Sequence, residues 1–182
     1  MKSILFTLAA IGLLGLTSAS AQLLSSTSAQ TSFFSETPLE NIVANNTKVK
    51  AVLNPANNQV AVRMEMAEFQ FPNKLMQEHF NENYIESEKF PTASFQGTIN
   101  EKIDWSKPGT YPVTAKGTLD IHGVKQPRTL TGTLTIEASR ILLTTDFTVQ
   151  PAAHHIQIPT LMIVKIAEQI KVTNKVEFNR KS

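Results

Sequence analysis

The sequence predicts an all-β protein, a closed antiparallel barrel of about eight strands with one or two short helices. Apolar and polar residues alternate through most of the chain after residue 45, which is typical of half-buried strands. A sheet with one apolar and one polar face is usually antiparallel. About eight such strands close most easily into a barrel, because closure removes the exposed edges. Only two segments have helical spacing instead.

The N-terminus is predicted to be a secretory signal peptide. Lys2 is followed by a short apolar run over residues 4–16 and by the small residues Ala19-Ser20-Ala21. A membrane anchor is the alternative, but a span needs about 20 apolar residues. We therefore expect cleavage after Ala21, which makes residues 1–21 the signal peptide, and a periplasmic or secreted domain over residues 22–182.

Composition narrows the possible partners. The chain has a formal net charge of +2 and no cysteine, so its core must hold it without disulfides. A nucleic-acid-binding protein would carry a basic excess, and no apolar run after the signal peptide is long enough to span a membrane. Nucleic acid and a stable membrane span are therefore not expected.

The first strands are less regular than the later ones. Residues 22–31 are small and polar and predict a mobile arm or the lead into a strand, and further strands are expected around 32–34 and over 47–54. From residue 60 the apolar residues keep one parity and then switch, so we expect a β-bulge near Ala67–Glu68. The residues on either side of this switch are Val60, Val62, Met64 and Met66, then Phe69 and Phe71.

Five later segments repeat the alternation, with threonines or charges on the other parity. Their inward residues are Ala93, Phe95, Gly97 and Ile99; Val113, Ala115, Gly117, Leu119 and Ile121; Leu130, Gly132, Leu134 and Ile136; Ile141, Leu143, Phe147 and Val149; and Val172, Val176 and Phe178.

Two segments predict helices. Residues 73–84 place apolar residues at spacings of three to five, with Asn73 as the N-cap, and residues 158–170 are apolar on most sides and begin with Pro159. The apolar positions are Leu75, Met76, His79, Phe80 and Tyr84 in the first helix, and Leu161, Ile163, Val164, Ile166, Ala167 and Ile170 in the second.

The acidic run in the first helical segment does not predict a catalytic site. Glu78 and Glu82 stack on the polar face, and Glu86 and Glu88 follow it. Acid–base catalysis needs two carboxylates aimed at one buried point, and a calcium loop needs alternating carboxylates and a glycine. We interpret these glutamates as a solvated face.

The histidines do not predict catalysis or metal binding either. His79 lies on the apolar face, His122 precedes Gly123 in a turn, and His154 and His155 would point to opposite faces of a strand. No GxSxG, GxGxxG or P-loop motif occurs. We expect no enzyme, no metal site and no cofactor other than a bound lipid. An enzymatic alternative would need His122, His154 or His155 beside a carboxylate in a cleft.

Two stretches together resemble one family. HFNENYIESEKFPTASFQG and AKGTLDIHGVKQPRTLTG resemble the YceI-like proteins, in their order and spacing over about residues 69–134. The resemblance implies a lipocalin-like barrel with a long apolar pore, partly capped by helix, that holds a long isoprenoid or related lipid without catalysis. The polar N-terminal strand and His154-His155 depart from the family pattern, near the expected position of a lipid head group.

We predict a hollow barrel. Small inward residues, namely Ala93, Gly97, Ala115, Gly117 and Gly132, would leave space along the axis, although strand glycines also mark bends. A charge-free lining suits a ligand whose gain is burial, about 0.8 kcal/mol per CH₂. The expected lining residues are Met64, Met66, Phe69, Phe71, Leu75, Met76, Phe95, Val113, Leu119, Ile121, Leu143, Phe147, Ile163 and Ile166.

The function predicted from these observations is an exported carrier or sequestering protein for a long-chain isoprenoid or other lipid. The alternative is a barrel with a solid core that acts as a protein-interaction or structural module. A homodimer is a further possibility, because many exported barrels form dimers.

Overall fold

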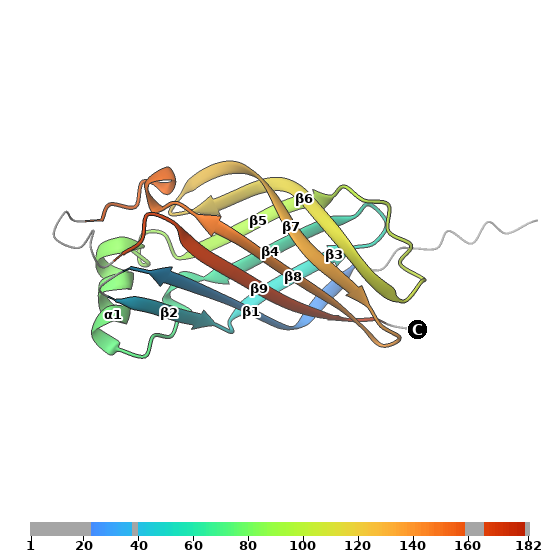
Figure 1. The fold of residues 1–182 in the computed structure, drawn as a ribbon, viewed down its shortest axis with the longest axis horizontal. Helices are drawn as coiled ribbons and strands as arrows, with labels where there is room; N and C mark the ends of the chain where they lie inside the picture. Colours follow the sequence, from blue (N-terminus) through green and yellow to red (C-terminus); the bar gives the residue numbers. More distant parts are fainter. Residues whose placement is uncertain (1–22, 38–39, 159–165, 181–182) are drawn as a thin grey trace, which may run out of the picture.

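The computed structural model describes residues 23–37, 40–158 and 166–180. Nine strands form one antiparallel sheet in the order β2-β1-β3-β4-β5-β6-β7-β8-β9, and β1 also pairs with β9. The sheet thus closes into a barrel of eight strands, with β2 as an additional strand beside β1 (Figure 1). The predicted closed antiparallel barrel is confirmed. The strands are β1 (Leu24–Glu36), β2 (Asn41–Asn46), β3 (Val49–Asn54), β4 (Gln59–Glu65), β5 (Thr92–Ile99), β6 (Gly109–Ile121), β7 (Val124–Ile136), β8 (Arg140–Val149) and β9 (Ile170–Asn179).

The polar segment near the N-terminus belongs to the barrel. Its residues from Leu24 onward lie in β1, which pairs with β9 from Ser26 to Phe34. The alternative of a mobile arm is therefore wrong for these residues. Strand preference depends on the neighbours more than on intrinsic propensity, and here pairing on both edges of β1 holds a serine- and threonine-rich stretch extended.

The parity switch after β4 is made by a helical turn and not by a β-bulge. β4 ends at Glu65, and a 3₁₀ turn spans Met66–Glu68. The backbone N–H of Met66 donates to the carbonyl of Pro91 at 2.9 Å. The chain leaves the sheet at this point, so the bulge expected at Ala67–Glu68 is replaced by the turn.

One α-helix stands at one end of the barrel (Figure 1). It is α1 (Lys74–His79), and Asn73 caps it by accepting from the N–H of Leu75. A single π-helical turn, η2 (Phe80–Tyr84), continues it. The predicted first helix and its N-cap are confirmed, with a wider last turn than expected.

The predicted second helix falls largely on residues 159–165, which lie outside the described residues. Its last part is not helical: residues 166–169 carry no helix, and Ile170 begins β9. The N–H of Ala167 donates to the Ser35 hydroxyl at 2.9 Å, so this segment is tied to β1 and not to a helical turn of its own.

The end of the barrel opposite α1 is solid. Five side chains from β3, β7, β8 and β9 are at most 2% exposed there and fill the axis. Trp105 and Ile103, from the β5–β6 loop, pack against the same cluster. The five are Leu53, Leu134, Ile136, Ile141 and Phe178.

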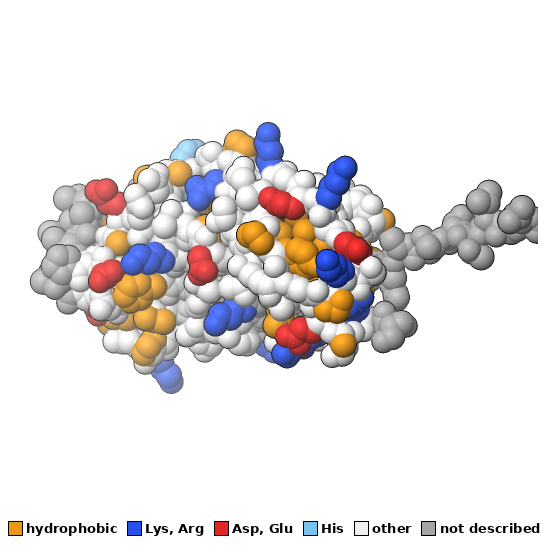
Figure 2. All heavy atoms as spheres, turned by 45° about the vertical axis from the view of Figure 1, so that its right-hand side comes forward, with side chains coloured by type: hydrophobic (Ala, Val, Ile, Leu, Met, Phe, Trp, Pro, Cys, Tyr) orange, Lys and Arg blue, Asp and Glu red, His pale blue; other side chains and the backbone are white. Residues whose placement is uncertain are grey.

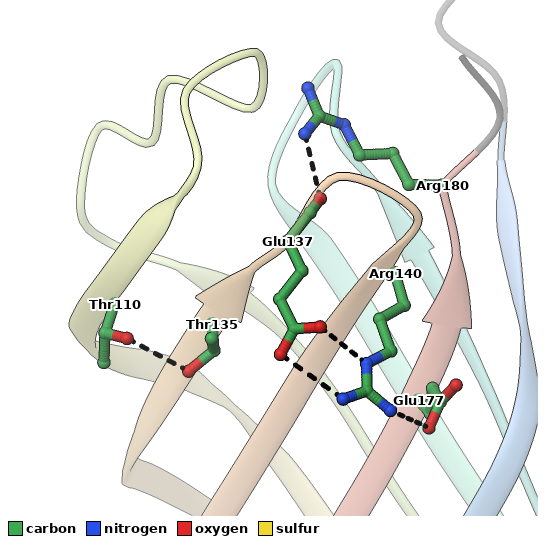
Figure 3. A network of polar contacts seen from close by, with 6 residues as sticks. All are labelled: Thr110, Thr135, Glu137, Arg140, Glu177 and Arg180. Carbon is green, nitrogen blue, oxygen red and sulfur yellow. Dashed lines mark hydrogen bonds and ion pairs between the residues drawn. The ribbon is translucent and has the colours of Figure 1, made fainter.

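Ionic and polar contacts hold the turn between β7 and β8 at this closed end (Figure 3). Arg140 contacts Glu137 at 2.8 Å and Glu177 at 3.6 Å. Arg180 donates to the carbonyl oxygen of Glu137 at 3.1 Å and to that of Ser106 at 2.8 Å. These contacts join β9 to the turn and to the β5–β6 loop. Because they are half-exposed, each contributes little to stability.

Two of the small inward residues do not leave space along the axis. Gly97 and Gly117 face each other across β5 and β6. A Cβ on Gly117 would overlap the carbonyl oxygen of Gln96 and lie 2.6 Å from the Cα of Gly97, and a Cβ on Gly97 would meet the Phe95 ring at 2.8 Å. These glycines mark a close approach of two strands, which agrees with the alternative that strand glycines mark bends and not empty space.

Gly117→Ala is expected to destabilise the barrel by about 1–3 kcal/mol, because the new methyl meets backbone atoms that cannot rotate away. Urea unfolding of the purified protein measures the loss. Thr118→Ala, on the exposed neighbour, is the matched control and should change stability by less than about 0.5 kcal/mol. Equal stability of Gly117→Ala and wild type would contradict the close approach.

Candidate functional site

A cavity of about 410 Å³ lies inside the barrel. This volume is within the range of small-molecule sites, about 300–1,000 Å³. Its deep part reaches Val60, Ile99 and Leu130, next to the solid core of the closed end. Its other part reaches α1. The interior is therefore hollow toward the α1 end of the barrel and filled toward the opposite end. The alternative of a solid core holds only for this closed end.

The cavity meets solvent beside α1. Asn73 and Leu75 line it and are exposed, Leu75 to 56%. Glu40, in the segment between β1 and β2, and Ile166, just before β9, line the same end. This end, which we call the mouth, is the side on which Figure 1 shows α1.

Nearly all of the predicted lining residues lie on the cavity wall. Seven of them lie on strands, where successive side chains point to opposite faces, namely Met64, Phe95, Val113, Leu119, Ile121, Leu143 and Phe147. Their contact with a ligand stays a prediction. Those on the wall are Met64, Met66, Phe71, Leu75, Met76, Phe95, Val113, Leu119, Ile121, Leu143, Phe147 and Ile166.

Phe69 is an exception, and the prediction that it lines the cavity is wrong. It is buried in an aromatic cluster, with ring centroids 5.2 Å from Phe33 and 5.7 Å from Phe80. The 3₁₀ turn before Phe69 takes it off the strand, so strand parity no longer sets its direction. Ile163, the remaining predicted lining residue, lies outside the described residues.

The wall also carries polar side chains that the sequence analysis missed. Thr31 and Asn174 are 1% and 8% exposed and line the cavity together with Thr145 and Ser35. The signal was present in the alternation, since Asn174 shares the parity of Val172 and Val176. The predicted lining consists of apolar residues alone, so it does not include Asn174.

The expectation of a charge-free lining needs correction at the mouth. Glu40 contributes a carboxylate there, and His79 and Tyr84 also line the cavity. A tyrosine hydroxyl is protonated at pH 7 and can donate a hydrogen bond, and burial raises the pKa of the Tyr84 hydroxyl further. Deeper in, the wall carries no charged residue among those that the structure describes.

His122 and Glu86 form a pair outside the cavity wall. His122 is in the β6–β7 turn, with φ 55° before Gly123, so the predicted turn histidine is confirmed. Its Nε2 lies 2.9 Å from Glu86 Oε2 and its Nδ1 lies 3.1 Å from the carbonyl of His154. Glu86 is thus half-buried and paired, unlike the exposed Glu78, Glu82 and Glu88. The pair joins three loops, and His122 does not face the cavity.

His154 and His155 diverge, as predicted, but from a 3₁₀ turn and not from a strand. The turn spans Pro151–His154. His154 is 2% exposed, and its Nδ1 donates to the carbonyl of Val124 at 3.2 Å, whereas His155 is exposed. Within residues 23–37, 40–158 and 166–180, no three histidine or acidic side chains are grouped so that they could hold a metal ion.

The stability of the protein should fall in weak acid because of His154. Burial lowers the pKa of its imidazole from the ordinary 6.5, so the unfolded chain binds the proton more readily than the fold does. The contribution of neutral His154 to the free energy of unfolding is complete above about pH 6.5, and it is lost as the pH falls from there through the lowered pKa. His154→Asn keeps an N–H toward Val124 but does not titrate, so urea midpoints should drop less for this variant than for wild type between pH 7.5 and about pH 5. Equal drops would contradict the assignment.

Comparison with known families finds one match. The profile of the YceI-like domain matches residues 24–178, which is most of the chain. No curated protein sequence matches it.

Solved structures share the fold at low sequence identity. The polyisoprenoid binding domain from Saccharophagus degradans implicated in plant cell wall breakdown has a TM-score of 0.74 and 12% identity, over 87% of this chain and 98% of that one. BcnA of Burkholderia cenocepacia has a TM-score of 0.69 and 14% identity, over 82% and 95%. The YCEI protein of Campylobacter jejuni has a TM-score of 0.60 and 15% identity, over the whole of both chains.

Proposed function

The chain belongs to the YceI-like domain family, and from this premise we propose that it binds a long-chain isoprenoid or another lipid non-covalently inside its barrel. The cavity of about 410 Å³ carries the proposal, because its deep wall is almost entirely apolar. The structural neighbour from Saccharophagus degradans, a polyisoprenoid binding domain, supports it.

The shape of the cavity favours a chain-like ligand. A chain that enters at the mouth is stopped by the closed-end core, which includes Leu53 and Phe178. Each CH₂ that leaves water contributes about 0.8 kcal/mol, and the methionines Met64, Met66 and Met76 can adapt to different chains. A polar head group that stays at the mouth would meet Glu40, His79 and Tyr84.

The proposed role is binding without chemistry. The His122–Glu86 pair, which is an acid–base candidate by its chemistry, does not lie on the cavity wall. Sequestering or carrying the lipid needs only the burial that the wall offers, so we assign no catalytic residue.

We also propose that the protein is exported, with residues 1–21 as a cleaved signal peptide, as its N-terminal pattern predicts. No helix in the described part of the chain is long and apolar enough to span a membrane. Basic and acidic side chains are interspersed on the face that Figure 2 shows, so a nucleic-acid surface is not part of the proposal. A carrier for lipid outside the cytoplasm fits these features.

Extraction of the purified protein with organic solvent, followed by mass spectrometry, tests the binding. We expect a long-chain lipid in near-stoichiometric amount. A protein that comes out empty, and that takes up neither a prenyl quinone nor a fatty acid when these are offered, would contradict the proposal. The N-terminal residue of the mature protein, read by mass spectrometry, tests the cleavage after Ala21.

A further inference from the structure

Three neighbouring strands place a polar side chain at one level of the cavity wall. Thr31 on β1 pairs across the sheet with Asn174 on β9, and Asn174 pairs with Thr145 on β8. All three side chains line the cavity near the middle of their strands. We call this set the polar belt.

The three side chains of the polar belt are hydrogen-bonded to one another, and some of their hydrogen-bond donors have no acceptor in the part of the chain that the structure describes. The Thr31 hydroxyl donates to Asn174 Oδ1, and Asn174 Nδ2 donates to Thr145 Oγ1 at 3.3 Å. An asparagine amide has two N–H donors, and a threonine hydroxyl that accepts still has its own proton to give. Among the described residues, no acceptor takes the Thr145 proton or a second N–H of Asn174.

Such a belt lowers the stability of the fold unless a ligand accepts its free hydrogen bonds. Polar groups in an apolar wall lose their hydration, and donors left without an acceptor add to that loss. Valine or leucine at these positions would fit the alternation equally well, as Val172 and Val176 do on the same strand. The free donors therefore point to an acceptor that enters the cavity.

We propose that the polar belt selects lipids with an uncharged hydrogen-bond acceptor, such as a ketone or ester oxygen, that reaches the middle of the barrel. This inference rests on the proposed function and names the ligand class of the same cavity. The acceptor oxygen takes the Thr145 hydroxyl proton and the free N–H of Asn174. A carboxylate is disfavoured, because no cationic side chain lies on the described wall to pair with it.

Thr145→Val tests the belt with little change of shape. It replaces the Thr145 hydroxyl with a methyl group, and the Thr31–Asn174 bond does not involve Thr145. Thr144→Val is the matched control, because Thr144 is the adjacent residue and is absent from the wall. Asn174→Leu is a second variant, which removes both the bond to Thr31 and the remaining N–H donors.

The measurement is native mass spectrometry of the full protein equilibrated with equal amounts of a C20 isoprenoid ketone and the C20 isoprenoid hydrocarbon. Wild type and Thr144→Val should favour the ketone by at least about threefold, as expected when one or two hydrogen bonds are added. Thr145→Val and Asn174→Leu each remove one of the two proposed donors and should lower this ratio. The C20 carboxylic acid, offered against the ketone, should lose to it in wild type.

The outcomes separate the two proposals. Binding of both probes with no preference in wild type, or the same preference in Thr145→Val, overturns the polar belt and leaves lipid binding intact. Failure of every probe to bind overturns the proposed function itself. If Asn174→Leu does not fold, Thr145→Val alone still decides the outcome, because its valine has nearly the volume of threonine.

Discussion

Phe178→Ala should lower the free energy of unfolding by about 3–5 kcal/mol, as for other fully buried phenylalanines. The side chain is 0% exposed and packs in the closed-end core with Leu53 and Ile141. Truncation leaves a void that the surrounding strands cannot fill, because the closed barrel fixes their spacing. Urea unfolding of the lipid-free protein measures the loss.

Phe147→Ala is the matched comparison at the hollow end. Phe147 lines the cavity and is only partly buried, so its removal enlarges an existing space and should cost about half as much. Equal losses for the two variants would contradict a barrel that is solid at one end and hollow at the other.

Ala115→Phe should reduce the amount of lipid that copurifies by at least about tenfold, which corresponds to about 1.4 kcal/mol of binding free energy. Ala115 lines the cavity between its partners Ile99 and Leu130. A phenylalanine ring at this position occupies the space of the ligand chain. The fold should tolerate it, because the ring extends into the hollow and not into packed atoms. Lipid extraction and mass spectrometry measure the occupancy.

Thr118→Phe, on the outer face of the same strand, is the control and should keep wild-type occupancy, because Thr118 is exposed and absent from the wall. A folded Ala115→Phe protein with wild-type lipid content would show that the ligand lies outside the barrel. Far-UV circular dichroism confirms that both variants are folded.

The side of the sheet that each strand residue faces was readable from the sequence. Leu119 and Thr118 fall on opposite faces as their parity predicts, because the two-residue period is a property of the extended backbone itself. The same rule places Asn174 and Thr145 on the inner face, because they share the parity of the apolar residues in their strands. The prediction failed at Phe69, where a 3₁₀ turn replaces the strand, and parity has no meaning in a turn.

Contacts between segments that are distant in the chain could not be predicted from the sequence. Glu86 and His122 belong to separate stretches, and neither has a local pattern that predicts their 2.9 Å contact. The sequence predicts that Gly97 and Gly117 leave space along the axis, whereas in the structure they allow the backbones of β5 and β6 to approach each other closely. Both outcomes depend on which strand lies beside which, and this pairing is fixed only when the sheet closes.

The sequence by itself determined an alternating, cysteine-free chain whose inner side chains are mostly apolar, because alternation is local and follows from covalent geometry. The tertiary structure alone decided where that interior is filled and where it stays empty. Large side chains such as Leu53 and Phe178 fill the axis at one end, whereas small ones such as Ala115 and Thr145 line the cavity farther along. Whether opposing side chains meet depends on the length of each and on the width of the closed barrel, and both are set by strands that lie far apart in the chain.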